Sequence, residues 1–305
     1  MRLIKITFFT LLAALIFVGI LFYRSDISVD TLKAKYAYSD SKFMELDGLS
    51  VHYRVIGTGK PVVLLHGTGA SLHTWEQFSD NLKDSFQLIA LDLPAFGLTG
   101  GRADHDYSMK MYVDFLKKFT EKLNLTTLDL AGNSLGGGIA WEFAATYPEH
   151  IRRLVLMDAA GYPTGKPMPQ VFQLARNPVM GAILTKITPR FFIKNNLLEV
   201  YDNDALVSDA LVDRVLDMSL REGNRQAFID RTNLPLHDAA ERIKTIVDST
   251  LIIWGDNDPW IPVSSAQLFH KDLKNSQLAI LKNCGHLPME ERAVETAGLV
   301  RAFLR

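Results

Sequence analysis

The residues whose types and spacing point most directly to chemistry are Gly132-Asn133-Ser134-Leu135-Gly136. This segment follows an apolar run at 128–131 and precedes a helical pattern at 135–146. A serine in a sharp turn between a strand and a helix is held in a strained backbone conformation that exposes its hydroxyl above the sheet. Glycines two positions before and after it leave room for the close packing of such a turn. We therefore interpret Ser134 as a nucleophile; the alternative is a helix-capping serine beside two chance glycines.

A serine hydroxyl is a weak nucleophile unless a general base takes its proton and an acid orients that base. The segment Asn283-Cys284-Gly285-His286 directly follows the last apolar run and supplies a histidine in a glycine-containing loop. Asp258 lies in the loop that follows the apolar run at 250–254. The expected catalytic residues are therefore Ser134, Asp258 and His286, in this chain order.

Other acids and histidines are kept as alternatives or assigned to structure. Asp256 is a second candidate for the acid. Asp158 is a third, and its expected role is to end the apolar run at 154–157. His52 falls on an expected hairpin strand. The histidines expected on solvated helix or loop surfaces are His73, His105, His150, His237 and His270.

A loop with two glycines, His66-Gly67-Thr68-Gly69, follows the apolar run at 61–65. Such a loop can direct backbone N–H groups toward a developing negative oxygen. A helix that starts beside the serine adds the positive end of its dipole at the same place. We assign the oxyanion hole to the N–H groups of Thr68 and Leu135, and we expect His66 to brace the loop rather than act as a second base.

Short apolar runs alternate with helical patterns through most of the chain. Such runs indicate strands buried on both faces, and their alternation with helices indicates a mostly parallel sheet covered by helices. The expected strands lie at 43–46, 51–55, 61–65, 86–91, 128–131, 154–157, 250–254 and 277–281. The expected helices lie at 72–83, 108–123, 135–146, 263–272 and 289–304. No strong strand pattern occurs between 161 and 248, so we expect a helical insertion over one end of the sheet.

The composition excludes several classes of protein. The chain has 305 residues, of which 48% are hydrophobic and 22% charged, so it is neither disordered nor fibrous. A net charge of -1 without a basic stripe argues against nucleic acid as a partner. The single cysteine, Cys284, excludes an internal disulfide and a cysteine-based metal site. Serine chemistry needs neither a metal nor an organic cofactor, so we expect none. The expected partner is a small-molecule substrate. The oligomeric state is left open.

The first residues predict attachment to a membrane. Residues 6–23 carry no charge and would reach about 27 Å as a helix, close to the thickness of a bilayer core. We interpret 1–23 as a membrane anchor; the alternative is a signal segment that is cleaved, followed by secretion. We expect the catalytic body to lie outside the cytoplasm. Residues 24–40 read as a polar linker.

From about residue 43 onward the chain resembles the α/β-hydrolase family, in its serine-nucleophile branch with a helical cap. The segments that carry the resemblance are His66-Gly67-Thr68-Gly69, Asp92-Leu93-Pro94-Ala95-Phe96-Gly97, Gly132–Gly137, Trp254–Asp258 and Cys284-Gly285-His286. The resemblance implies a core at 41–160 and 249–305 and a cap at 161–248. It maps the family's nucleophile, acid and base onto Ser134, Asp258 and His286. One departure is Ala95, where relatives often carry glycine, and it bears on the local turn alone.

The resemblance implies hydrolysis of an ester or a related acyl compound, with a small or hydrophobic substrate, through an acyl-enzyme. The alternative within the family is a carbon–carbon bond hydrolase of the kind that acts on meta-cleavage products. An alternative of another class is a non-catalytic homologue that binds a ligand under its cap. Five cap residues are apolar enough to line the acyl pocket: Phe172, Met180, Phe191, Phe192 and Phe228.

Overall fold

The apolar runs of the sequence form one eight-stranded sheet in the order β1-β2-β4-β3-β5-β6-β7-β8. This computed structural model describes residues 19, 21–235 and 239–305. The strands are β1 Lys42–Leu46, β2 Leu49–Ile56, β3 Lys60–Leu65, β4 Phe86–Leu91, β5 Leu128–Asn133, β6 Ile151–Met157, β7 Ser249–Gly255 and β8 Ser276–Leu281. From β4 through β8 neighbouring strands run parallel, whereas β1 and β2 join as an antiparallel hairpin and β2 pairs antiparallel with β4. The predicted mostly parallel sheet is therefore confirmed.

Strand order reverses between β3 and β5, because β4 lies on one side of β3 while β5 and all later strands lie on the other. In open parallel sheets a crevice forms at such a reversal, beyond the carboxyl ends of the strands. The loop after β3 and the turn after β5 therefore meet at this edge. These are the segments in which the sequence places the oxyanion loop and the nucleophile.

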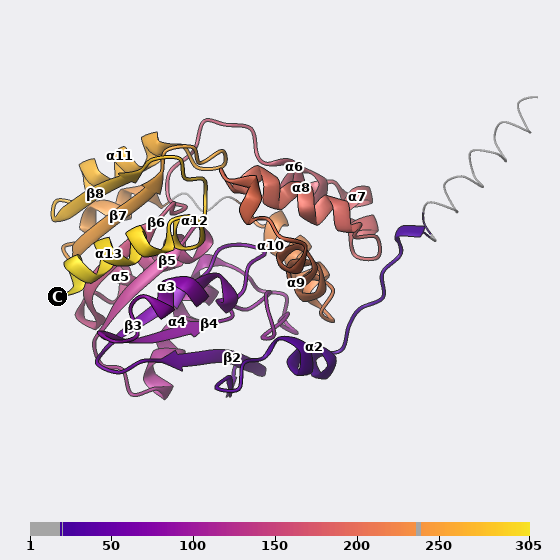
Figure 1. The fold of residues 1–305 in the computed structure, drawn as a ribbon, viewed down its shortest axis with the longest axis horizontal. Helices are drawn as coiled ribbons and strands as arrows, with labels where there is room; N and C mark the ends of the chain where they lie inside the picture. The colour runs from indigo at the N-terminus through magenta and orange to yellow at the C-terminus, as the bar shows by residue number, and fades with distance from the viewer. Residues whose placement is uncertain (1–18, 20, 236–238) are drawn as a thin grey trace, which may run out of the picture.

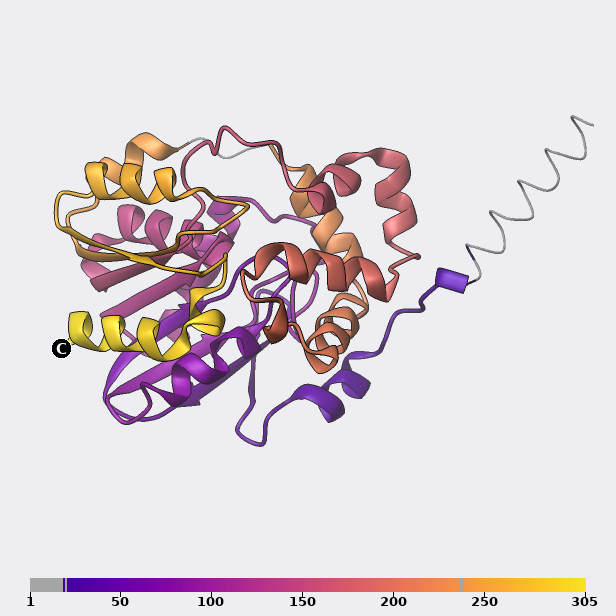
Figure 2. The same ribbon diagram turned by 45° about the horizontal axis from the view of Figure 1, so that its top comes forward.

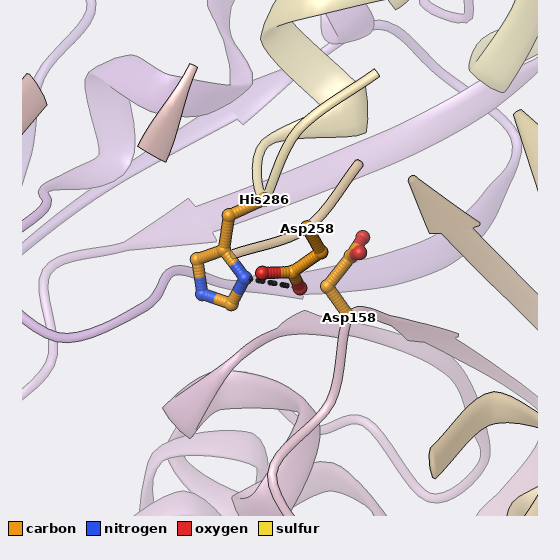
Figure 3. Close-up of side chains that lie close together, drawn as sticks. All are labelled: Asp158, Asp258 and His286. Carbon is orange, nitrogen blue, oxygen red and sulfur yellow. Dashed lines mark hydrogen bonds and ion pairs between the residues drawn. The ribbon is translucent and has the colours of Figure 1, made fainter. Parts of the chain in front are cut away.

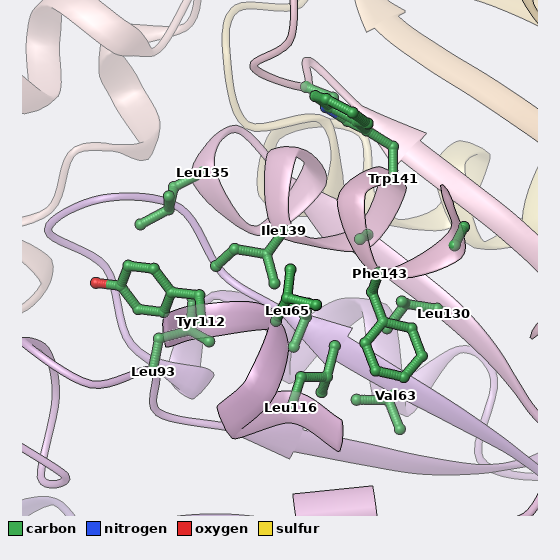
Figure 4. Packing of buried hydrophobic residues seen from close by; sticks show 14 of the residues in the cluster. Val63, Leu65, Leu93, Tyr112, Leu116, Leu130, Leu135, Ile139, Trp141 and Phe143 are labelled. Carbon is green, nitrogen blue, oxygen red and sulfur yellow. The ribbon is translucent and has the colours of Figure 1, made fainter. Parts of the chain in front are cut away.

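Each face of the sheet is covered by helices. Side chains alternate along a strand, so Val63 and Leu65 of β3 face one layer, whereas Val62 and Leu64 face the other. The first layer contains α4 (Met109–Lys122), α5 (Leu135–Thr146) and α11 (Val263–Asp272), and the second contains η1 (Leu72–Trp75), α3 (Glu76–Asp80), α12 (Pro288–Glu291) and α13 (Ala293–Leu304). Figures 1 and 2 show these layers, and Figure 4 shows the packing of α4 and α5 against β3 and β5.

The core helices agree closely with the sequence pattern, with two exceptions. The pattern predicts one helix over 72–83, but the structure has a 3₁₀ helix, η1, at Leu72–Trp75 and the short helix α3 at Glu76–Asp80, which ends three residues early. The pattern predicts one helix over 289–304, but the structure divides it into α12 and α13 at Arg292, whose backbone leaves the helical region at φ -129° and ψ 42°. A hydrogen bond joins the two pieces, because the hydroxyl of Thr296 in α13 donates to the carbonyl of Pro288 in α12 at 2.9 Å. Pro288 occupies the first position of α12, where proline is favoured, so it fixes where the first piece begins.

The chain between β6 and β7 is helical, as the missing strand pattern predicts. Its elements are α6 Gln170–Arg176, α7 Pro178–Leu184, α8 Arg190–Val200, η3 Asp204–Leu206, α9 Asp209–Ser219, α10 Asn224–Asn233 and η4 Ala240–Thr245. In Figures 1 and 2 helices α6 to α10 form one group at the end of the sheet away from the carboxyl terminus of the chain.

The segment before the hairpin lies against these helices and contains a helix of its own, α2 (Val29–Tyr36). The amide of Ile27 donates to the carbonyl of Leu220 at 2.8 Å. Arg225 donates to Asp26 at 2.6 Å and is itself 7% exposed. The residues that read as a polar linker are therefore docked along the cap helices, through partners that lie about 200 positions away in sequence.

The predicted membrane segment, residues 6–23, falls mostly outside the described residues. Within 19, 21–235 and 239–305, no helix combines the length and apolar character needed to cross a membrane.

Asp92, at the end of β4, is the centre of a fully buried polar network. One carboxylate oxygen accepts from the amide of Leu72, and the other accepts from the amide of Leu98 and from Nδ1 of His52, all at 2.7–2.8 Å. Burial acts to raise the pKa of this carboxyl, but the charge and hydrogen bond of His52 outweigh it and bring the pKa to about 2. His52 in turn bonds to the hydroxyl of Ser41 through Nε2, at 2.7 Å. This second serine–histidine–aspartate arrangement fastens the loops that follow β3 and β4.

His73 corrects a prediction. We expected it on a solvated surface, but it is 5% exposed and its pKa is lowered to about 4 by burial. Its ring bonds to the carbonyl of Tyr36 at 2.9 Å and to the hydroxyl of Ser71 at 3.0 Å. The helix periodicity at 72–83 could not reveal this, because the Tyr36 that covers it comes from the docked amino-terminal segment. His237 lies outside the described residues.

We expect Asp92→Asn to destabilise the fold by about 1–3 kcal/mol, because an amide leaves a buried donor of the network without its acceptor. The matched control is Asp40→Asn, which removes an exposed ion pair to Arg54 and should cost about 0–1 kcal/mol. The free energy of unfolding in guanidinium chloride measures both. Because the folded pKa of Asp92 lies below the unfolded value, its contribution is present above about pH 4 and is lost as the pH falls toward 2. Equal losses in the two variants would contradict the role of this network.

Candidate active site

Ser134 occupies the turn between β5 and α5, in a backbone conformation that L-residues rarely adopt, with φ 53° and ψ -115°. The turn is fastened on both sides. The amide of Ser134 donates to the carbonyl of Met157 at 3.0 Å, and its carbonyl accepts from Gly138 at 2.9 Å and Ala160 at 3.0 Å. These bonds offset the cost of the strained conformation, which is of order 1–3 kcal/mol.

The glycines on either side of the serine are required by close approach. A Cβ atom at Gly132 would lie 2.2 Å from the carbonyl oxygen of Gly136. A Cβ atom at Gly136 would lie 2.2 Å from the carbonyl oxygen of Leu65, at the end of β3. Any side chain at either position would push α5 away from β3 and β5. The spacing that singled out Ser134 in the sequence is thus explained by backbone contact.

His286 and Asp258 are brought together from the loops after β8 and β7. Nδ1 of His286 bonds to Oδ2 of Asp258 at 2.7 Å, and both residues are at least 95% buried (Figure 3). The other oxygen of Asp258 accepts from the amides of Trp260 at 2.8 Å and Ile261 at 3.0 Å. Burial acts to raise the pKa of Asp258, but His286 and these amides outweigh it and hold the pKa below its ordinary value. An ionised carboxylate thus fixes the imidazole with Nε2 turned away from it.

Nε2 of His286 is buried and has no hydrogen-bond partner among the described residues. Ser134 and His286 line the same cavity, but no hydrogen bond joins the hydroxyl to the imidazole. Such bonds are often long in ligand-free enzymes and tighten when substrate binds. Asn133 links the two segments, because its side-chain amide donates to the carbonyl of His286 at 3.0 Å.

The predicted oxyanion loop is braced as expected. His66 is fully buried, accepts the amide of Leu93 at Nε2 at 3.0 Å, and donates from Nδ1 to the carbonyl of Gly67 at 2.7 Å. Burial lowers the pKa of His66, which keeps the ring neutral and both bonds in place. The amides of Thr68 and Leu135 have no acceptor in the part of the chain that the structure describes, and the amide of Leu135 belongs to the first turn of α5. Both amides are therefore free to donate to a ligand oxygen.

Asp158 and Asp256 are placed differently from Asp258. Asp256 pairs with Lys282 at 3.2 Å, away from the imidazole. Asp158 is fully buried at the end of β6, and oxygen or nitrogen atoms of Asp158, Asp258 and His286 lie within 4.8 Å of one another. Burial and the nearby charge of Asp258 raise the pKa of Asp158 well above its ordinary value. Within the described residues this spacing could also hold a metal ion, but the bond between His286 and Asp258 already uses the two groups, so we assign the cluster to orienting the base.

A cavity of about 190 Å³ lies between the cap helices and this edge of the sheet. Of the five cap residues expected to line it, Phe172, Phe192 and Phe228 do so. The expectation was wrong for Met180 and Phe191, which are not part of the lining, and Phe191 is 56% exposed on the outer side of α8. Composition alone could not tell which face of each cap helix turns inward.

An aromatic row that the sequence reasoning missed leads from the imidazole into the cavity. Trp260 lies 5.5 Å from His286, Phe172 lies 5.4 Å from Trp260, and Phe228 stacks on Phe172 at 5.8 Å, measured between ring centroids. Trp260 follows Asp258 by two positions, so its place beside the acid could have been inferred from the sequence. The pairing of Phe172 with Phe228 joins α6 to α10 and has no local signal.

A family model described as the alpha/beta hydrolase fold matches residues 60–293. The chain belongs to the α/β-hydrolase family. A 2-hydroxymuconate semialdehyde hydrolase from Pseudomonas sp. (strain CF600) is 30% identical over 270 residues, which cover 84% of this chain and 91% of that protein. The family model and this relative establish the chain as a hydrolase.

Two solved structures of relatives are similar over most of their length. A meta-cleavage product hydrolase from Pseudomonas fluorescens IP01 has a TM-score of 0.75 and 28% identity, over 86% of this chain and 97% of that one. A structure described as a membrane phospholipase A, a bacterial virulence factor, also has a TM-score of 0.75 and 28% identity, over 100% of this chain and 98% of that one. The similar structures thus include both a meta-cleavage product hydrolase and a membrane phospholipase A.

We expect Asp258→Asn and Asp158→Asn to have different effects, which distinguish the roles of the two buried carboxyls. Asp258→Asn should slow the labelling of Ser134 by a fluorophosphonate probe by orders of magnitude, since the same change in the serine-protease template lowers kcat about 10⁴-fold. Asp158→Asn should leave labelling within a few-fold, because the amide keeps an oxygen to accept from the amide of Gly255 and removes a group whose charged form is disfavoured by burial.

The stability of Asp158→Asn gives a second measurement. A raised pKa makes ionisation of Asp158 oppose folding as the pH rises, so the asparagine variant should lose less stability than the parent between mildly acidic and alkaline pH. If Asp158→Asn also abolished labelling, the assignment of the orienting acid to Asp258 alone would be wrong.

Proposed function

We propose that this α/β-hydrolase cleaves an ester with a hydrophobic acyl chain through an acyl-enzyme at Ser134. The observation that carries the proposal is the aromatic row, which joins the buried imidazole of His286 to an apolar cavity under the cap. An acyl chain placed along Trp260, Phe172 and Phe228 would leave its carbonyl beside Ser134.

The mechanism follows from the geometry of the chain's own groups. Nε2 of His286 takes the proton of Ser134 as the hydroxyl attacks the carbonyl carbon, and the amides of Thr68 and Leu135 hold the oxyanion. Asp258 stabilises the imidazolium that forms. His286 then protonates the leaving alcohol, and water repeats the sequence on the acyl-enzyme to release the acid.

The charges around the cavity favour an uncharged acyl group. Arg225 is the one cation that lines the cavity within the described residues, and Asp26 already pairs with it at 2.6 Å. The acid in the lining, Glu290, has its pKa raised by burial, and it accepts from the hydroxyls of Thr74 and Tyr201. A carboxylate substrate would have to compete with Asp26 for its counter-charge, whereas an alkyl chain meets no such cost.

The second candidate is hydrolysis of a carbon–carbon bond, which the relative from Pseudomonas sp. (strain CF600) favours by its printed activity. That substrate is a carboxylate by name, so this candidate needs a hydrogen-bond donor in the cavity wall. Two donor atoms of Arg225, Nε and Nη1, have no partner among the described residues and could serve it. The third candidate, a ligand-binding homologue without catalysis, would leave Ser134 unreactive.

For location, we propose that residues 6–23 anchor the chain in a membrane, with the catalytic body outside the cytoplasm. Secretion after cleavage of this segment is the alternative. The similarity of the whole chain to a membrane phospholipase A supports the first proposal and agrees with a lipid-like ester as substrate.

A panel of p-nitrophenyl butyrate, octanoate and laurate in detergent tests the reaction. We expect the parent protein to hydrolyse all three and to prefer the longer acyl chains. Ser134→Ala should retain only the acceleration that the oxyanion hole and binding provide, about 10³–10⁴-fold over water in the template of such triads.

The other candidates predict different results from the same protein. Turnover of a ring-cleavage product without turnover of any ester would assign the carbon–carbon reaction. Failure of a fluorophosphonate probe to label Ser134 in folded protein that still binds a ligand would assign the non-catalytic role.

Phe228→Ala tests the course of the acyl chain. Losing an apolar contact deep in the cavity should lower kcat/KM for laurate roughly tenfold and leave butyrate unchanged, because the shorter chain ends before Phe228. Phe191→Ala is the matched control, since this phenylalanine is outside the cavity lining and should alter neither value with detergent-dispersed substrates. Equal loss for butyrate and laurate in Phe228→Ala would show that the residue stabilises the cap rather than contacts the chain.

A further inference from the structure

Helix α7 is apolar on every side although it lies on the outside of the cap. Its sequence, Pro178-Val179-Met180-Gly181-Ala182-Ile183-Leu184, contains no polar side chain. Leu184 lines the cavity, while Val179 is 66% exposed and Ile183 is 38% exposed on the outer face. A helix that is hydrophobic all round is normally buried on all sides. The outer face of α7 is instead exposed, with no apolar surface of the described residues covering Val179.

Other exposed apolar side chains lie where the amino-terminal segment meets the connection from α7 to α8, at Ile187 and Phe191. Phe191 of α8 is 56% exposed, and in the amino-terminal segment Leu21 and Tyr23 are 52% and 54% exposed. Half of the large hydrophobic side chains that are exposed in the described residues belong to this region. We call it the cap patch, and its members are Leu21, Tyr23, Val179, Ile183 and Phe191.

Contacts between the amino-terminal segment and the cap hold the patch together. Tyr23 forms a β-bridge with Ile187, the amide of Arg24 donates to the carbonyl of Lys186 at 3.0 Å, and the ring of Phe22 meets that of Phe191 edge-on at 5.8 Å. The uncharged run that begins at residue 6 therefore ends on the cap, against α7 and α8. Figures 1 and 2 both show the amino-terminal segment arriving beside these helices.

The charge of this part of the chain has one sign. Between Asp158 and Glu199 the sequence has five basic residues and no acidic one: Lys166, Arg176, Lys186, Arg190 and Lys194. The whole chain has a net charge of -1, so this stretch differs from the rest of the chain by its lack of acidic residues. Arg190 is paired with Asp209 and Asp213 of α9, whereas Lys186 and Lys194 form no ion pair with any described residue. Apolar side chains beside unpaired cations are typical of surfaces that lie in the interface of an anionic bilayer.

We propose that the cap patch is a membrane-contact surface, which rests in the interface of a lipid bilayer while the cavity opens behind it. The bilayer is favoured over a second copy of the chain by two observations: the uncharged run of residues 6–23 ends on the patch, and like-charged lysines beside it would repel a symmetric copy. Inner faces of the same helices line the cavity through Leu184, Phe192 and Ile193, so contact with lipid would bear directly on the cap. This proposal concerns binding alone and does not depend on the ester reaction.

The only native cysteine makes a site-specific probe practical. Cys284 is fully buried, so a single new cysteine on the surface can be labelled selectively with an environment-sensitive fluorophore. The full chain, reconstituted in vesicles of phosphatidylcholine and phosphatidylglycerol, would carry the probe at Val179→Cys, Ile183→Cys or Phe191→Cys. Matched controls are Val247→Cys and Val294→Cys, which replace residues that are 74% and 73% exposed outside the patch.

We expect probes on the patch to emit at shorter wavelength in vesicles and to lose emission when brominated lipids are included. Probes at 247 and 294 should keep the emission of an aqueous probe. Emission at aqueous wavelength from all three patch positions would overturn the proposal. A shift without quenching by brominated lipids would also overturn it, because protein rather than lipid would then cover the patch: a second copy if the shift weakens on dilution into excess vesicles, and the chain's own first residues if it does not.

A second measurement separates this surface from the catalytic proposal. Val179→Ser with Phe191→Ser should lower the rate of fluorophosphonate labelling by a probe embedded in the vesicles, with no change for a soluble probe. Unchanged labelling by the embedded probe would contradict a role of the patch in reaching lipid, even with the reactivity of Ser134 intact. Loss of labelling by both probes in the parent protein would instead contradict the proposed function and leave the fluorescence result standing.

Discussion

The arrangement proposed for catalysis depends on how closely helix α5 approaches strands β3 and β5. Backbone atoms of Gly132, Gly136 and Leu65 leave no space for a side chain at either glycine. This contact sets the strained turn at Ser134 and brings the free amide of Leu135 to the edge of the sheet, next to the loop after β3. A serine at the same sequence position on a looser turn would have neither a fixed hydroxyl nor a helix end directed at its substrate.

Two polar networks hold the loops around this turn, and each uses a buried histidine. His66 ties the loop after β3 to the loop after β4, and Asp92 fastens the same two loops through amides of Leu72 and Leu98. His286, by contrast, keeps one ring nitrogen without a partner. Burial makes an unsatisfied polar atom costly, so a buried histidine that keeps one marks a place where a ligand group completes the bonding. A histidine thus braces loops at position 66, and at position 286 it is the proposed base.

The cap helices have an inner face that lines the cavity and an outer face that is exposed to the surroundings of the protein. Its inner faces supply Phe172 and Phe228 to the aromatic row that begins at Trp260, and its outer faces carry the apolar and cationic side chains of α7 and α8. The amino-terminal segment is fastened to the same helices by Asp26 and Arg225, and Arg225 also lines the cavity. A displacement of this segment would therefore break the ion pair between Asp26 and Arg225. It would leave the charge of Arg225 unpaired in the cavity wall.

The sequence alone determined the parallel sheet, the helical insertion and the turn at Ser134, because these depend on local apolar runs and on glycines two positions from a serine. It also singled out the three residues proposed as nucleophile, acid and base. Tertiary structure decided which acid meets the imidazole: Asp258 does so, while Asp256 turns to Lys282 and Asp158 lies buried behind. It also buried His73 under Tyr36 and turned Phe191 outward and Phe172 inward. Each of these outcomes depends on contact between residues far apart in the chain, which no periodicity within one segment encodes.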